Sequence, residues 1–466
     1  YEARKGVALM QNSRCAVILA ASDGKQMKSS RPAAMAEVLF QPMIDWVLDA
    51  VQNAGIQSTC TVAAHCEALA SHLEGRGETI LLGPSGTGHA ISQARAFLER
   101  FRGGDVFLLN GNIPLIDADT IRSAFDAHKR AGNAATILAA FVKNSNGYPH
   151  IARSADGAFA GILAEQDANE TGREVFAGAG WFQCDQLLRA TGQIAEECTG
   201  RESNLIDVVQ CMLDSRQHVG VFTAADPDIA LKADDRVQLL HLNNLARQRM
   251  LMHWLLEGVD IPCADGVFIG PDVTIGADTR ILPGTILRGK TIIGKNCIIG
   301  PNTQLIDTLA GDNVKLDNVL SEQAEIQEGA DIGPFVHLRP NAKIGPHTHL
   351  GNFVEVKNAR IGEGTKVSHL TYVGDADVGK SVNFGCGCVT VNYTGKEKHR
   401  TVIGDHAFIG CNSNLVAPVR VGDYGYTAAG STITDDVPAN ALGIARARQV
   451  NKEGWVLRKK PYKGMK

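Results

Sequence analysis

The chain has 466 residues, 44% hydrophobic and 21% charged, which is ordinary for a globular protein and long enough for two or three domains. A formal net charge of −4 gives no electrostatic reason to expect nucleic acid or an anionic membrane as a partner. No apolar run approaches the ~18 residues of a membrane span, and the eleven cysteines form no C-x-x-C pair. We therefore expect a cytoplasmic protein with reduced thiols and no zinc site.

The first half of the chain alternates strand and helix patterns. Continuous apolar runs over residues 15–21, 106–109 and 134–141 predict parallel strands buried on both faces. Apolar residues at helical spacing predict a helix over residues 43–54. The expected fold is a Rossmann-like α/β sheet that binds ligands at the carboxyl ends of its strands.

Residues 235–256 predict a long amphipathic helix that bridges two domains. Beyond it, aliphatic residues recur every sixth position, which is typical of a parallel β-helix built from hexapeptides whose aliphatic residues point inward. The repeat runs, with several phase breaks, through Ile269, Ile275, Ile281, Leu287, Ile293, Ile299, Leu305, Val314, Leu320, Ile326, Ile332, Leu338, Ile344, Leu350, Val356, Ile361, Val367, Val373, Val378, Phe384, Ile403, Ile409, Leu415 and Val421.

The expected domains are an α/β domain over residues 13–234, a linker helix over 235–258, a β-helix over 259–438 and a tail over 439–466. Several motifs stand in register along the β-helix: L-R-P at 338–340, G-N-F-V-E-V-K at 351–357, S-H-L-T-Y at 368–372, V-N-Y at 391–393 and I-A-R at 444–446. In this order they resemble the bacterial family of bifunctional N-acetylglucosamine-1-phosphate uridyltransferase / glucosamine-1-phosphate N-acetyltransferase enzymes. The resemblance covers about residues 13–457 and implies a nucleotidyltransferase domain followed by a left-handed β-helix.

The resemblance implies an acetyl transfer from acetyl-CoA to a sugar amine, with His369 as general base, because the reaction needs a base that titrates near neutrality. The matched ligands of the sugar phosphate are Arg339, Lys357, Tyr372, Asn383 and Lys398. The matched ligands of acetyl-CoA are Cys386, Asn392, Tyr393, Cys411, Ala429 and Arg446. The family also implies a homotrimer with the site between subunits.

Two of these positions depart from the commonest family residues. Cys386 stands where alanine is usual, and Cys411 where serine is usual. They raise the idea of a cysteine acyl-enzyme, which we disfavour because direct attack by the amine needs no such nucleophile.

In the first domain the motifs depart from the family's pattern more widely. Its first loop keeps the framework of Leu19, Ala20 and Ala21, and Gly86 and Thr87 keep the uracil-side motif. The phosphate loop has lost a glycine and two cations, at Ser22, Gln26 and Ala33. Asn112, after Gly111, replaces a magnesium-binding aspartate, and an amide is a poorer ligand for a hard cation. The remaining departures are Leu81, Pro149, Ala164, Phe176 and Asp234.

The leading hypothesis is therefore a glucosamine-1-phosphate N-acetyltransferase in UDP-N-acetylglucosamine biosynthesis whose uridyltransferase-like domain is inactive. The first alternative is the full bifunctional enzyme, which also transfers UMP from UTP with Mg²⁺. The second is a non-enzymatic trimeric scaffold. A domain that binds nucleotide without catalysis also stays open.

Overall fold

The computed structural model describes residues 14–22, 24–82, 90–145, 147–163, 173–197 and 204–461, the side chains of 195–197 excepted. The chain divides into two compact units between Gln248 and Arg249, inside helix α9 (Arg236–Leu256). Among the described residues, no helix has the length and apolar character that crossing a bilayer requires.

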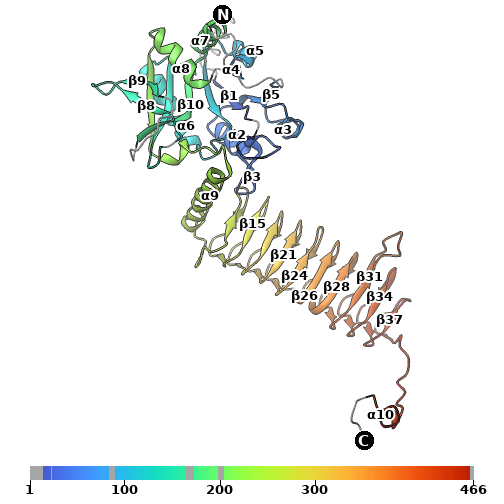
Figure 1. The fold of residues 1–466 in the computed structure, drawn as a ribbon. Coiled ribbons are helices and arrows are strands. Elements are labelled where there is room, and N and C mark those ends of the chain that lie inside the picture. Colours follow the sequence, from blue (N-terminus) through green and yellow to red (C-terminus); the bar gives the residue numbers. More distant parts are fainter. Residues whose placement is uncertain are drawn as a thin grey trace, which may run out of the picture. The chain divides into compact units, whose positions relative to one another are not determined.

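The first unit is built on one mixed sheet (Figure 1). Its main strands, in spatial order, are β11 (Val219–Ala224), β7 (Ala135–Val142), β10 (Arg173–Gln183), β6 (Asp105–Asn110), β1 (Arg14–Ala20), β4 (Ser58–Ala63) and β5 (Glu78–Leu81). Strands β8 (His150–Arg153) and β9 (Phe159–Leu163) extend it beside β10, and β2 (Glu37–Val38) pairs with β3 (Gln41–Pro42). Strand β10 runs antiparallel to both of its neighbours, β6 and β7, a reversal that the sequence pattern did not predict.

The helices of this unit are α2 (Met43–Asn53), α3 (Glu67–His72), α4 (Ala90–Gln93), α5 (Arg95–Glu99), α6 (Ala118–Ala131), α7 (Cys184–Glu197) and α8 (Leu205–Asp214), with short helices η1 (Ala33–Met35) and η2 (Pro227–Ala230). The predicted strands and the predicted helix over residues 43–54 are confirmed to within two residues by β1, β6, β7 and α2. Strand β1 lies between β4 and β6 and is parallel to both. The carboxyl ends of β1 and β6 therefore meet at one edge of the sheet.

The second unit is a left-handed parallel β-helix (Figure 1). Ile269 pairs with Leu287 and Leu287 with Leu305, so one coil takes 18 residues, or three hexapeptides. The strands up to residue 344 are β12 (Phe268–Ile269), β13 (Thr274–Ile275), β14 (Arg280–Ile281), β15 (Ile286–Arg288), β16 (Ile292–Ile293), β17 (Ile298–Ile299), β18 (Gln304–Ile306), β19 (Leu309–Ala310), β20 (Lys315–Leu316), β21 (Val319–Glu322), β22 (Glu325–Ile326), β23 (Asp331–Ile332), β24 (Val336–Leu338) and β25 (Lys343–Ile344).

The later coils contain β26 (His349–Lys357), β27 (Arg360–Ile361), β28 (Lys366–Gly374), β29 (Ala376–Val378), β30 (Asn383–Phe384), β31 (Val389–Val391), β32 (Thr401–Ile403), β33 (Phe408–Ile409), β34 (Asn414–Val416), β35 (Val419–Val421), β36 (Tyr426–Thr427), β37 (Thr432–Ile433) and β38 (Leu442–Gly443). Strand β38 pairs with β36, so stacking continues past residue 438. Helix α10 (Trp455–Lys459) follows in the tail.

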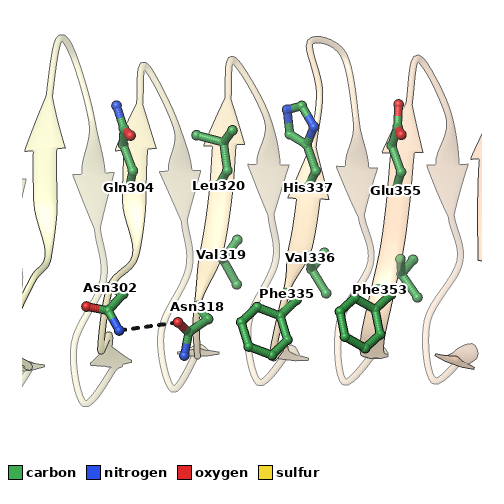
Figure 2. A pocket seen from close by; sticks show the side chains of 11 residues that line it. Asn302, Gln304, Asn318, Val319, Leu320, Phe335, Val336, His337, Phe353 and Glu355 are labelled. Carbon is green, nitrogen blue, oxygen red and sulfur yellow. Dashed lines mark hydrogen bonds between the residues drawn. The ribbon is translucent and has the colours of Figure 1, made fainter. Parts of the chain in front are cut away.

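The core of the β-helix follows the six-residue repeat, and the predicted inward residues are buried with one exception. That exception is Leu320, which faces outward (Figure 2). Leu305 pairs with Ser321, and Ser321 with Leu338, so the serine holds the inward position in this coil. Its hydroxyl lies 2.9 Å from Thr308 Oγ1, which satisfies a polar group that would otherwise be costly to bury. The prediction for Leu320 was wrong because the phase break moved the inward position by one residue.

Helix α9 is long, as predicted, but it is not cleanly amphipathic. Leu242 and Trp254 are buried, whereas Val237 and Leu256 are 77% and 79% exposed. Within the first unit, the amide of Asn243 accepts a hydrogen bond from Leu39 N and donates one to Glu37 O, which fixes the start of the helix to the β2–β3 ribbon. Apolar residues therefore occupy both buried and exposed faces of α9.

Candidate active sites

The coils of the β-helix turn at stacked corner residues with positive φ. Phe335, Phe353 and Leu370 have φ values of 62°, 59° and 47°. Figure 2 shows the two phenylalanines of this column, whose ring centroids lie 5.3 Å apart in a stacked arrangement. Asn302 and Asn318 occupy the same column in earlier coils. Because β26 and β28 run in parallel register, the residues just before each corner also form a column.

His369 belongs to this second column, directly before the Leu370 corner, and it pairs in register with Asn352. The next positions in the column are Cys386, Cys411 and Ala429. The corner amides link them: Asn412 N donates to Cys386 O at 2.8 Å, and Gly430 N donates to Cys411 O at 2.8 Å. The structure thus brings the predicted base and three predicted acetyl-CoA residues onto one edge of consecutive coils.

Arg446 reaches the same column from the tail. Its Nη1 atom donates to the carbonyl oxygen of Ala429 at 2.9 Å, which leaves the guanidinium exposed beside the column. The structure therefore places this predicted cofactor ligand with Ala429, although the two residues are 17 positions apart.

A buried carboxylate organises the face beyond the corner. Asp375 is 5% exposed, and its two oxygens accept hydrogen bonds from the side-chain amides of Asn358 and Asn392. Asn392 also hydrogen-bonds Tyr372; burial raises the pKa of Tyr372, and this hydrogen bond offsets part of the rise. The geometry thus joins two predicted site residues, Asn392 and Tyr372, through a residue that the sequence analysis missed.

The two cations predicted to bind the sugar phosphate lie on adjacent coils. Arg339 N donates to Val356 O at 2.8 Å, which sets Arg339 beside Lys357, and Lys357 pairs with Gly374. Gly374 is five residues beyond His369 on β28, which corresponds to at most ~17 Å of strand. Both cations therefore lie on the face that follows the Leu370 corner, whereas His369 lies directly before that corner.

Glu355 is the second residue that sequence reasoning missed. Arg339 donates to it at 2.9 Å, and this hydrogen bond raises the pKa of the arginine. Glu355 also pairs in register with Tyr372. Its place inside the G-N-F-V-E-V-K motif was the available signal, since that motif was noted only for its lysine.

The remaining predicted residues of the second unit flank this face. Asn383 begins β30 and pairs with Lys366, on the side of the corner opposite Tyr372. Tyr393 and Lys398 form an antiparallel bridge at the base of the loop that follows β31. The Tyr393 ring is 57% exposed, and its hydroxyl donates to Gly395 O at 2.7 Å. The loop thus presents both residues at the surface.

The first unit contains a cavity of about 300 Å³ at the carboxyl ends of β1 and β6. Its lining consists of Leu19, Ala20, Ala21, Ser22, Ala34, Ala90, Ile91, Asn110, Gly111, Asn112, Asn204, Leu205, Lys232 and Asp234. A Cβ atom on Gly111 would lie 3.2 Å from Ala20 Cβ, so a glycine lets the two strand ends approach closely. The predicted residues that line this cavity include the first-loop residues Leu19, Ala20 and Ala21. They also include the two residues at the predicted metal site, Asn112 and Asp234.

Other predicted residues of this unit lie away from the cavity. Ala33 and Phe176 are 1% and 5% exposed in the hydrophobic core, while Gln26 is exposed on the first loop. Leu81 is 41% exposed at the end of β5 and does not line the cavity. Pro149 accepts a backbone hydrogen bond from Phe176. For Phe176, core packing explains the residue type better than a ligand contact does. Gly86, Thr87 and Ala164 lie outside the described residues.

The metal-side positions do not fit a protein-bound magnesium ion. Asn112 Nδ2 donates to Asp234 Oδ1 at 2.7 Å, and Lys232 Nζ lies 2.9 Å from Asp234 Oδ2. Both carboxylate oxygens are therefore engaged, whereas Mg²⁺ needs oxygen ligands in near-octahedral geometry. Over the described part of the chain, no group of three or more His, Cys, Asp or Glu side chains converges on a metal position.

Comparison with known proteins covers both units. The family model of the MobA-like NTP transferase domain matches residues 16–186, and that of the bacterial transferase hexapeptide (six repeats) matches residues 272–307. The chain is 41% identical to the bifunctional protein GlmU of Acetivibrio thermocellus, over 95% of this chain and 97% of that protein. It is 42% identical to the protein of the same name from Enterococcus faecalis, over 97% and 99%. The similarity thus extends through both units at full length.

Proposed function

Because the chain belongs to the GlmU family of bifunctional proteins, we propose that its β-helix transfers the acetyl group of acetyl-CoA to the amine of glucosamine-1-phosphate. The chain is a transferase with a hexapeptide-repeat domain. The observation that carries the proposal is the column that sets His369 beside Cys386, Cys411 and Ala429 on consecutive coils.

In this reaction His369 takes a proton from the sugar ammonium, and the free amine attacks the thioester carbonyl. A C–N bond forms, the C–S bond breaks, and the departing CoA thiolate takes up the proton that the nitrogen loses as it becomes an amide. Arg339 and Lys357 bind the sugar phosphate, since a guanidinium and an ammonium suit its charge. Asn392, held by Asp375, orients the thioester, and the neighbouring backbone amides support the developing oxyanion.

The coenzyme lies along the column of cysteines in this proposal, with Arg446 and Tyr393 at its ends. Cys386 and Cys411 serve as small packing residues there. Arg446 suits a CoA phosphate because its guanidinium is exposed at the edge of the column.

We further propose that the chain assembles as a homotrimer. Phe335, Phe353 and Leu370 are 55%, 58% and 57% exposed and stack in one apolar column next to His369. A second copy that covers this column would remove exposed aromatic surface and would bring further side chains close to His369. Light scattering of the full chain should give three times the 49.7 kDa mass.

For the first unit, the full-length likeness to bifunctional relatives supports the alternative of a working uridyltransferase better than the silent domain that led our sequence interpretation. We infer transfer of UMP from UTP to N-acetylglucosamine-1-phosphate in the cavity at the ends of β1 and β6. Of the three substituted loop residues, Ser22 lines that cavity, whereas Gln26 and Ala33 do not.

A paired assay on one preparation tests both activities. Thiol release from acetyl-CoA with glucosamine-1-phosphate reports the β-helix, and pyrophosphate release from UTP with N-acetylglucosamine-1-phosphate and Mg²⁺ reports the first unit. Both products are expected. Thiol without pyrophosphate would restore the silent-domain hypothesis, and the absence of thiol release would refute the acetyltransferase proposal.

A further inference from the structure

Asn112, Lys232 and Asp234 form a charge-neutral cluster on the wall of the first unit's cavity. Asp234 is the centre of the cluster, accepting from the Asn112 amide at 2.7 Å and pairing with the Lys232 ammonium at 2.9 Å. The Lys232 and Asp234 side chains are only 26% and 25% exposed. Partial burial strengthens this ion pair relative to a fully solvated one.

The cluster has the wrong polarity for a divalent cation. The positions that face Asp234 are occupied by an N–H donor and an ammonium, and no second carboxylate lines the cavity among the residues described. A cation would have to displace Lys232 and reverse the Asn112 amide. An anion would meet the Lys232 ammonium, which carries three N–H donors and whose direction Asp234 fixes. This attraction has to exceed the repulsion between the anion and the Asp234 carboxylate.

We propose that the cavity binds the phosphates of a uridine nucleotide without a protein-held divalent cation, with the Lys232 ammonium supplying the positive charge in the metal's place. That the ligand is a uridine nucleotide rests on the proposed uridyltransferase role of the first unit. That it binds without a divalent cation rests only on the cluster of Asn112, Lys232 and Asp234. The cavity fits a ligand of mixed character. Leu19 and Ile91 offer apolar contacts for a base or ribose, and Asn110 and Asn204 offer amides for hydroxyl groups.

Calorimetric titration of the full chain with UDP-N-acetylglucosamine, in EDTA and then in Mg²⁺, tests the proposal. A diphosphate ester is the suitable probe because it chelates free Mg²⁺ less strongly than UTP does. We expect the same dissociation constant in both buffers. Lys232→Ala should weaken binding about tenfold to a hundredfold in both, which is the contribution of a hydrogen bond to a charged group.

Lys129→Ala is the matched control. Lys129 also pairs with an aspartate, Asp105, at 3.0 Å, but Asp105 begins β6 whereas the cavity lies at the other end of that strand. Its removal should leave nucleotide affinity unchanged. A double variant, Asn112→Asp with Lys232→Ala, provides two carboxylates and no ammonium, and its binding should become dependent on Mg²⁺.

Four results would overturn the inference: binding of the unaltered chain only with Mg²⁺, equal affinity in Lys232→Ala, Mg²⁺-independent binding by the double variant, or no binding with and without Mg²⁺. The first of these would leave the proposed uridyltransferase intact. If UDP-N-acetylglucosamine binds neither in EDTA nor in Mg²⁺, both proposals for the first unit are overturned. Thiol release by the same preparation would then show that the β-helix unit is folded.

Discussion

Asp375 gives the sharpest test of the acetyltransferase geometry, because it contacts other side chains of the proposed site while lying buried itself. Its two oxygens accept from Asn358 and Asn392, and Asn392 in turn hydrogen-bonds Tyr372. In Asp375→Asn, one oxygen becomes an NH₂ group that faces an amide donor. Asn392 can restore the contact only by reversing its own amide, which removes the donor from Tyr372.

The expected loss of acetyltransferase activity follows from the hydrogen bonds that the substitution removes. A hydrogen bond to a charged group contributes about 1.5–3 kcal/mol. If the Asn392 bond is lost and the loss appears in the positioning of Asn392 during acetyl transfer, kcat/KM falls about tenfold to a hundredfold. The fold should persist, because the surrounding coils hold one another through their own backbone hydrogen bonds.

The assay is thiol release from acetyl-CoA with glucosamine-1-phosphate, measured as kcat and as KM for each substrate. Asp377→Asn is the control: it is the same substitution two residues further on, at a carboxylate that is 49% exposed and paired with Arg400. Such a surface pair contributes about 0–1 kcal/mol, so this variant should keep wild-type rates. Equal kcat/KM for the two variants would refute the positioning role of Asp375.

Three further predictions follow from individual side chains. His369→Ala should lower kcat for acetyl transfer about 10²–10⁴-fold with an unchanged circular dichroism spectrum; an unchanged rate would remove it as the base. Burial raises the pKa of Cys388 to about 11, so iodoacetamide at pH 8 should modify exposed Cys411 and leave Cys388 intact, as peptide mass spectrometry would show. The Arg153 hydrogen bonds lower the pKa of Glu174, so its stabilisation is present above an unfolded value of about 4.3 and is lost as pH falls through the folded value. Glu174→Gln should therefore show a smaller drop in Tm between neutral and acid pH than the unaltered chain, and an equal drop would contradict the assignment.

The β-helix was predictable because its information is local. Each aliphatic residue from Ile269 to Leu305 specifies its inward position through a six-residue spacing that needs no knowledge of distant contacts. Leu320 shows where this reasoning fails. At the phase break the inward position passed to Ser321, and only the register with Leu305 and Leu338 identifies it.

The candidate acetyltransferase site was likewise predictable only in part. Motifs in the sequence predicted His369 as the base and a set of acetyl-CoA residues, but the assembly of these residues depends on coils of unequal length. Leu370 stacks over Gly387, 17 positions later, whereas the register of β31 with β34 gives a coil of 25 residues. The loop at Tyr393 that lengthens this coil leaves the column of Cys386 and Cys411 intact, which periodicity by itself does not reveal.

In the first unit, the sequence alone determined the buried strands and located the loop and metal-side residues. The tertiary structure decided what those residues do. It buried Phe176 in the core, and it brought Lys232 and Asp234 to Asn112 across more than a hundred residues. The role of a polar side chain depends on which partner meets it in space, and β1 and β6 become neighbours only when the sheet forms.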